Sequence, residues 1–281
     1  MMGLFKKKEK KESSASGEEY RAFAAGFLPE ELNILAVTGA SGFNGGRAGG
    51  DQLWTAGVEL TAWMEEDSPD IHQGRFQLTS KVDEKLLDYL RQRVPRDFII
   101  QCKARLSKDG TRLLLLDLPK PGFDPDLKAI LQEQKKPVTF EAEGLGVFVL
   151  NRSVDWFETE LLWLDHPVQL AFDQSGDRES CLTAARTLAG SQEEWDRRIR
   201  VYAAQELLTL ANEWADNDGE DEDAVPITKE QFMERMELES IQVQADGGFD
   251  FWFADGDLFY GHAIRVSGNL EQGPEEAQME G

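Results

Sequence analysis

The spacing of hydrophobic residues divides the chain into segments typical of strands and segments typical of helices. Residues 53–64 carry hydrophobic side chains at alternate positions, which predicts a strand with one buried face. Residues 98–106 and 111–116 are apolar runs on either side of Asp109-Gly110, a pair that favours a tight hairpin turn. Between the predicted strands 53–64 and 98–106, four apolar residues recur at helical spacing: Val82, Leu86, Leu87 and Leu90. Ser80, with Asp83 three residues later, is expected to begin that helix.

A second region begins near residue 141 and combines strands with a long helix. Six apolar runs predict strands: 147–150, 156–164, 168–172, 238–244, 249–253 and 258–267. Residues 191–215 give the clearest helical pattern, with one wide apolar face. That face consists of Trp195, Ile199, Tyr202, Ala203, Leu207, Leu210 and Trp214. A shorter helix is expected after Thr228, which has Gln231 at the capping-box position.

These elements predict an α+β protein with two domains and a tail. We expect a tail over residues 1–21, a strand-rich N-terminal α+β domain over 22–140, and a C-terminal domain over 141–281. The element order of the N-terminal domain would suit a small barrel of the oligonucleotide-binding type. The C-terminal domain is expected to pack an antiparallel sheet on its long helix.

Acidic residues outnumber basic residues by a wide margin. The chain holds 53 Asp and Glu against 30 Lys and Arg, a formal net charge of −23 at pH 7. A field of this sign repels the phosphates of nucleic acids and attracts cationic partners. We therefore expect a basic protein partner and no nucleic acid.

The first residues of the chain are basic and polar. Residues 1–21 combine five lysines with serine and glycine, a composition that cannot bury surface. One short apolar pair beside the lysines leaves peripheral membrane contact through residues 3–11 as an alternative to a solubilising tail. No secretory signal or membrane-spanning run is recognised. A cytoplasmic protein is expected, with Cys102 and Cys181 as reduced thiols.

Residues 38–45, at the start of a glycine-rich segment over 39–50, resemble the nucleotide-binding loop of the extended short-chain dehydrogenases. The later glycines cannot make the helix that such a loop needs, at roughly 1 kcal/mol lost per glycine relative to alanine. The Tyr-x-x-x-Lys pair of those enzymes is not found at these tyrosines, because the residue four positions after Tyr89 is Arg93 and the residue four positions after Tyr202 is Glu206. The segment therefore predicts a flexible loop, and no cofactor is expected.

Residues 213–223 hold seven acids and no Lys or Arg. Their alternation resembles an EF-hand calcium loop, but the glycine at the sixth position and the glutamate at the twelfth are missing. A solvated acidic loop is the simplest interpretation. Six of these acids are our candidates for contact with a basic partner: Asp216, Asp218, Glu220, Asp221, Glu222 and Asp223.

Two carboxylates, a phenol and an imidazole lie within eight residues near the end of the chain. These candidate site residues are Asp255, Asp257, Tyr260 and His262. Carboxylates and histidine together bind divalent metals or transfer protons. In the alternative interpretation the two Asp residues form a turn and His262 makes a hydrogen bond inside the sheet.

Four segments of the second region form a specific combination: Asp155-Trp156-Phe157, Ala203-Ala204-Gln205-Glu206-Leu207-Leu208, Ile227-Thr228-Lys229-Glu230-Gln231-Phe232, and Phe249-Asp250-Phe251-Trp252-Phe253 with the run from Asp255 to His262. With these segments, residues 147–281 resemble the bacterial family catalogued as domain of unknown function 2262. The resemblance implies a bacterial source, and it brings no catalytic residues with it.

Two functions fit these observations. The first is a non-catalytic acidic interaction protein, either an adaptor or an immunity-type inhibitor of a basic protein. The second is a metal-assisted hydrolase with a site around Asp255, Asp257 and His262. The first is favoured because no complete catalytic set is recognised in the sequence.

Overall fold

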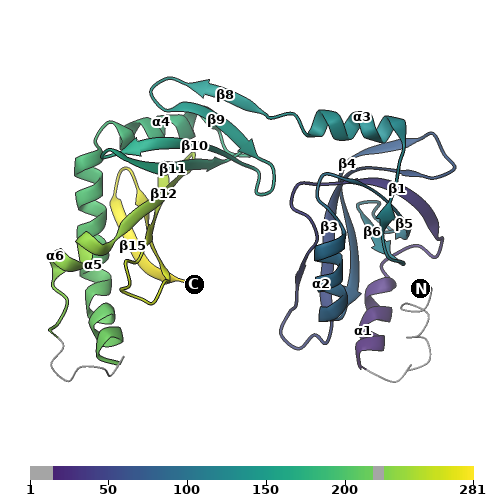
Figure 1. The fold of residues 1–281 in the computed structure, drawn as a ribbon, viewed down its shortest axis with the longest axis horizontal. Coiled ribbons are helices and arrows are strands. Elements are labelled where there is room, and N and C mark those ends of the chain that lie inside the picture. The colour runs from purple at the N-terminus through teal and green to yellow at the C-terminus, as the bar shows by residue number, and fades with distance from the viewer. Residues whose placement is uncertain (1–14, 218–224) are drawn as a thin grey trace. The chain divides into compact units, whose positions relative to one another are not determined.

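The structure is a computed structural model, and it describes residues 15–217 and 225–281 (Figure 1). The chain forms two compact units, Met1–Lys136 and Pro137–Gly281. We call them the barrel unit and the sheet unit.

The barrel unit is built on a closed sheet of five strands. These strands are β1 (Leu32–Thr38), β3 (Trp54–Glu65), β4 (Ile71–Val82), β5 (Ile99–Leu106) and β6 (Arg112–Leu115). They follow the order β1-β3-β4-β6-β5, and β1 also pairs with β5, which closes the barrel. The β4–β6 pair is parallel and the other neighbours are antiparallel. The barrel expected from the sequence is confirmed, with helix α2 (Glu84–Arg93) between β4 and β5.

Alternation along these strands places one set of side chains inside the barrel. Val58 and Leu60 of β3 and Leu78 of β4 are buried there with Leu87 and Leu90 of α2. Shorter elements complete the unit: α1 (Ala15–Ala24), β2 (Asn44–Gly46), β7 (Lys120–Pro121) and α3 (Pro125–Gln134). A separate small core joins α3 to the outside of the barrel.

The sheet unit is an eight-stranded sheet with the order β15-β14-β13-β12-β11-β10-β9-β8. Its strands are β8 (Thr139–Ala142), β9 (Gly146–Asn151), β10 (Trp156–Trp163), β11 (His166–Asp173), β12 (Glu237–Val243), β13 (Gly248–Ala254), β14 (Ala263–Asn269) and β15 (Gly273–Glu280). β11 and β12 run parallel, whereas the other neighbours are antiparallel. A parallel pair needs a crossover connection. Three helices provide it: α4 (Arg178–Ala189), α5 (Gln192–Asn217) and α6 (Lys229–Arg235).

One face of this sheet packs against the three helices and forms the core of the unit (Figure 1). Phenylalanine dominates this inner face. The rings of Phe140 and Phe148 stack with centroids 5.2 Å apart, and the edge of Phe157 meets Phe140 at 5.0 Å. The other face, which we call the outer face, carries polar and exposed apolar side chains. The expected α+β class, with an antiparallel sheet on a long helix, is confirmed, with β11 and β12 as the one parallel pair among the strands described for this sheet.

The structure corrects three sequence-based predictions. The tail was expected to reach residue 21, but α1 already begins at Ala15; the first 14 residues, with the candidate membrane segment, lie outside the described residues. Ser80 belongs to β4, and Asp83 is the N-cap of α2, where its side chain accepts the N–H of Leu86. The capping box of Thr228 and Gln231 is present as predicted.

The third correction concerns the last strands. The sequence predicted a single strand over 258–267, but residues 255–262 form a loop and β14 begins at Ala263. Backbone N–H groups of that loop donate to the Asp255 carboxylate, so they are not available to a neighbouring strand. β15 was not predicted, because its residues lack an apolar alternation. In the part of the chain that the structure describes, none of the helices has the length and apolar character needed to span a membrane.

Candidate functional site

The outer face of the sheet unit presents valines between carboxylates. Val147 and Val149 are 54% and 45% exposed, while Phe148 between them is fully buried on the inner face. The register places Glu141 of β8 directly opposite Val147, and Glu158 of β10 directly opposite Val149. Side chains that face each other across antiparallel strands lie on the same side of the sheet. Each valine therefore has a carboxylate as a neighbour on the outer face.

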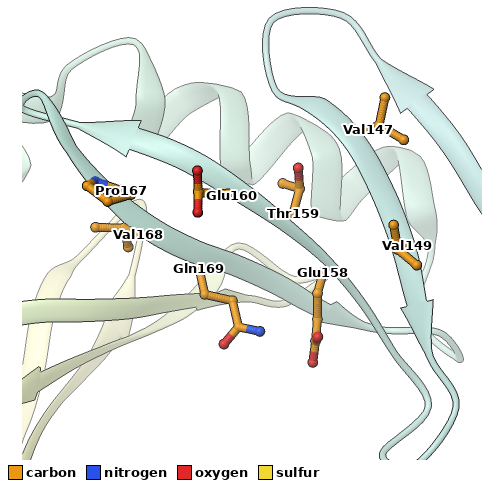
Figure 2. Close-up of a pocket in the computed structure, with 8 residues that line it drawn as sticks. All are labelled: Val147, Val149, Glu158, Thr159, Glu160, Pro167, Val168 and Gln169. Atoms are coloured by element: carbon orange, nitrogen blue, oxygen red, sulfur yellow. The ribbon is translucent and has the colours of Figure 1, made fainter.

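This part of the outer face is hollowed into a shallow cavity of about 420 Å³ (Figure 2). Its lining comes from three neighbouring strands: Val147 and Val149 of β9, Glu158, Thr159 and Glu160 of β10, and Pro167, Val168 and Gln169 of β11. The lining includes two carboxylates and no Lys or Arg. We call Glu141, Val147, Val149, Glu158 and Glu160 the valine–glutamate face. Sequence reasoning missed this face, because its members come from three strands whose register the sequence does not specify.

At the β13–β15 end of the outer face, carboxylates surround the guanidinium group of Arg265. Arg265 of β14 lies 3.9 Å from Asp250, 3.6 Å from Glu276 and 3.4 Å from Glu280. Its guanidinium also lies over the ring of Trp252, 5.7 Å from the centroid. Burial raises the pKa of Asp250, although the nearby Arg265 opposes this shift. The carboxylates at this end thus already have a cationic partner within the chain.

The four sequence-predicted site residues lie in the loop between β13 and β14. Asp255 is only 5% exposed, and its Oδ2 accepts the backbone N–H groups of Phe259 at 2.5 Å and Gly261 at 3.1 Å. Its Oδ1 accepts the N–H of Asp257 at 3.3 Å. The carboxylate is therefore enclosed by the loop that it shapes, whereas Asp257 is exposed.

Tyr260 and His262 gather around the last turns of α5. The Tyr260 ring stacks on Trp214 with centroids 5.5 Å apart, and its hydroxyl donates to the Trp214 carbonyl at 3.1 Å. His262 meets the same indole edge-on. Its Nδ1 lies 2.6 Å from the Phe259 carbonyl, which can only accept, so this nitrogen carries the proton. The loop is thus fastened to α5 by aromatic contacts and hydrogen bonds.

The geometry around His262 does not assemble a metal centre. Within residues 15–217 and 225–281, no group of three or more His, Cys, Asp or Glu side chains is arranged to hold a metal. The alternative interpretation, in which Asp255 and Asp257 form a turn and His262 makes a hydrogen bond, describes the observed loop. The His262 bond is made within the loop, however, and not inside the sheet.

Residues 142–279 match the family model DUF2262, whose description is "Uncharacterized protein conserved in bacteria". The sheet unit carries a DUF2262 domain. This confirms the resemblance seen in the sequence. Residues 19–134 match a second family model, DUF7021, described as a domain of unknown function. Neither the curated proteins nor the solved structures give a match to the chain.

The acidic run that the sequence singled out joins α5 to α6 in the DUF2262 domain. Asp216 lies in the last turn of α5. The other partner-binding candidates, Asp218, Glu220, Asp221, Glu222 and Asp223, lie outside the described residues.

Charge is divided very unevenly between the two units. The sheet unit, Pro137–Gly281, holds 9 Lys and Arg against 32 Asp and Glu, a formal charge of −23. The barrel unit holds 21 of each, a formal charge of zero. The whole excess of negative charge therefore belongs to the unit with the DUF2262 domain. The electrostatic argument against nucleic acid applies to that unit and not to the barrel.

Proposed function

We propose that the DUF2262 domain is a non-catalytic interaction domain that binds a basic protein partner in the bacterial cytoplasm. In this role the protein is an adaptor or an immunity-type inhibitor. The observation that supports the proposal is the division of charge, with 32 acidic and 9 basic residues in the sheet unit. A field concentrated on one domain speeds the encounter with a cationic protein and selects against anionic ones.

The geometry of the predicted catalytic residues also favours binding over chemistry. The Asp255 carboxylate is only 5% exposed and accepts three backbone N–H groups of its own loop. A general acid or base must instead reach a reacting atom. The metal-assisted hydrolase stays a prediction.

Affinity capture at two salt concentrations tests the interaction. The tagged full-length protein is incubated with a lysate of its bacterial source at low salt and then at high salt. We expect a basic protein in stoichiometric amount that salt releases, because screening weakens attraction between exposed charges. An empty capture at low salt would contradict the proposal, as would a stoichiometric partner that is itself acidic.

A further inference from the structure

We infer that the basic partner docks on the valine–glutamate face of the DUF2262 domain, with Lys or Arg side chains laid across Val147 and Val149. This inference rests on the proposed function and adds the place and chemistry of contact. The face unites two features that the rest of the outer face does not combine: exposed apolar side chains and carboxylates that flank them directly in the register.

The chemistry of Lys and Arg fits this arrangement. Their methylene stems cover apolar surface while the charged head stays at a polar rim. A stem over Val147 brings its head to Glu141, and a stem over Val149 brings its head to Glu158. Glu160 pairs with Gln169 on the next strand, which extends the carboxylate rim along β10. Charge-assisted hydrogen bonds to carboxylates are among the stronger polar contacts, so this rim selects bases.

The spacing of the valines also indicates the form of the partner segment. Val147 and Val149 are two residues apart on one strand, which sets them about 7 Å apart along β9. An extended segment with basic residues at alternate positions has the same repeat. A segment with adjacent basic residues points their side chains to opposite sides and places only half of them on the face. We therefore expect recognition of alternating bases in an extended segment.

Other occupants fit the face less well. A second copy of the chain would bring another sheet unit with a formal charge of −23 against the first. Nucleic acids and anionic lipid surfaces are repelled for the same reason. At the β13–β15 end of the outer face, Asp250, Glu276 and Glu280 are engaged with Arg265, whereas the lining around Val147 contains no base.

The test uses the full-length protein and two fluorescent peptides of equal charge. One peptide alternates arginine with threonine, and the other has the same residues with the arginines in one block. Fluorescence anisotropy at moderate salt is expected to show tighter binding of the alternating peptide. Backbone hydrogen exchange of the unmodified protein is expected to slow on β9 and β10 when this peptide is added.

Matched variants then locate the contact. Glu158→Gln with Glu160→Gln removes two charges from the face, and Glu206→Gln with Glu234→Gln removes two exposed charges from α5 and α6. We expect the first pair to weaken the alternating peptide roughly tenfold and the control pair less than twofold. Val147→Thr with Val149→Thr keeps the side-chain shape and strand propensity, and it is expected to weaken binding severalfold with all charges retained.

The outcomes separate the docking face from the proposed function. Equal weakening by the two glutamine pairs, or protection from exchange outside β8–β11, would overturn the docking face and leave a general acidic interaction domain. Equal binding of the two peptides would overturn the alternating-base readout. Failure of the unmodified protein to bind either peptide at low salt would overturn both the docking face and the proposed function. If the circular dichroism spectrum shows that a variant is unfolded, the docking face is tested by hydrogen-exchange protection of the unmodified protein alone.

Discussion

The Nζ of Lys81 lies 2.7 Å from Oε1 of Glu19, and this ion pair fastens α1 to strand β4 of the barrel. The other oxygen of Glu19 accepts the backbone N–H groups of Gln52 at 2.8 Å and Leu53 at 3.2 Å. Lys81 also lies 2.7 Å from Asp51. The Lys81 side chain is only 9% exposed, so water screens these contacts less than it screens an ordinary surface pair. The Glu19 side chain of α1 thus binds the backbone just after the glycine-rich segment, at Gln52 and Leu53.

Removal of the Glu19 charge is expected to loosen that segment. In Glu19→Gln the two backbone N–H groups keep an acceptor, but the ion pair with the partly buried Lys81 is lost. We expect hydrogen exchange over residues 44–53 and tryptic cleavage after Arg47 to become severalfold faster, because Gly46, Gly49 and Gly50 have open space around them. The rest of the barrel is expected to keep its protection.

Glu18→Gln is the matched control for this prediction. Glu18 is the preceding residue on α1 and is exposed. If both variants change the loop equally, the pairing of Glu19 with Lys81 is not what holds it. Faster exchange in β1 and β5 as well would show loss of the barrel and not a local effect.

Asp255 is expected to be the carboxylate on which stability of the DUF2262 domain depends most. Asp255→Ala leaves three backbone N–H groups of the 255–261 loop without their acceptor, one of them on the buried Phe259. We expect a loss of about 2–5 kcal/mol in the unfolding free energy of this domain, measured by denaturant titration. Asp257→Ala, at an exposed position of the same turn, is expected to cost much less. Similar losses for the two variants would show that the buried hydrogen bonds are not the cause.

Metal binding tests the hydrolase alternative. A ligand that binds only the folded state raises the melting temperature by mass action. If His262 served as a metal ligand, Mg²⁺, Mn²⁺ or Zn²⁺ would raise the melting temperature of the unmodified protein, and His262→Ala would abolish the rise. Because the Asp255 carboxylate, the other expected ligand beside His262, is enclosed by the loop and accepts three backbone N–H groups, we expect the two proteins to respond alike. A saturable rise in melting temperature that His262→Ala abolishes would support the hydrolase hypothesis.

Asp109 is expected to make the barrel unit sensitive to acid. Hydrogen bonds from the Ser107 hydroxyl and from the N–H and hydroxyl of Thr111 lower the pKa of Asp109 to about 2. A carboxyl whose pKa is lower in the folded state stabilises that state above its unfolded pKa of about 3.9, and this contribution is lost as the pH falls. Unfolding of the barrel should therefore become easier between about pH 4 and pH 2.

Asp109→Asn provides the comparison for this prediction. The amide oxygen of asparagine still accepts hydrogen bonds, but it does not titrate. The variant is expected to be somewhat less stable at pH 7 and to lose less stability in acid. Denaturant midpoints measured along the pH series check this, and identical slopes for the two proteins would rule out Asp109 as the group responsible.

The sequence by itself determined the elements whose burial pattern is local. The helical repeat from Trp195 to Trp214 predicted α5, because apolar residues at every third or fourth position fall on one face of a helix whatever packs against that face. The helix-capping box at Thr228 was equally local, since donor and acceptor lie three residues apart. Alternation likewise predicted β3, and a short apolar run predicted the segment that became β9.

Only the tertiary structure decided which strands became neighbours, and the candidate sites depend on that. Val147 lies opposite Glu141, and Val149 opposite Glu158, because β9 pairs with β8 and β10 in one register; a shift of one residue would send these side chains to the other face. The pairing of Glu19 with Lys81 and the burial of Asp255 likewise join residues through space. Local patterns record which face of an element avoids water, whereas contacts between distant segments depend on the packing of the whole domain, which a local pattern does not record.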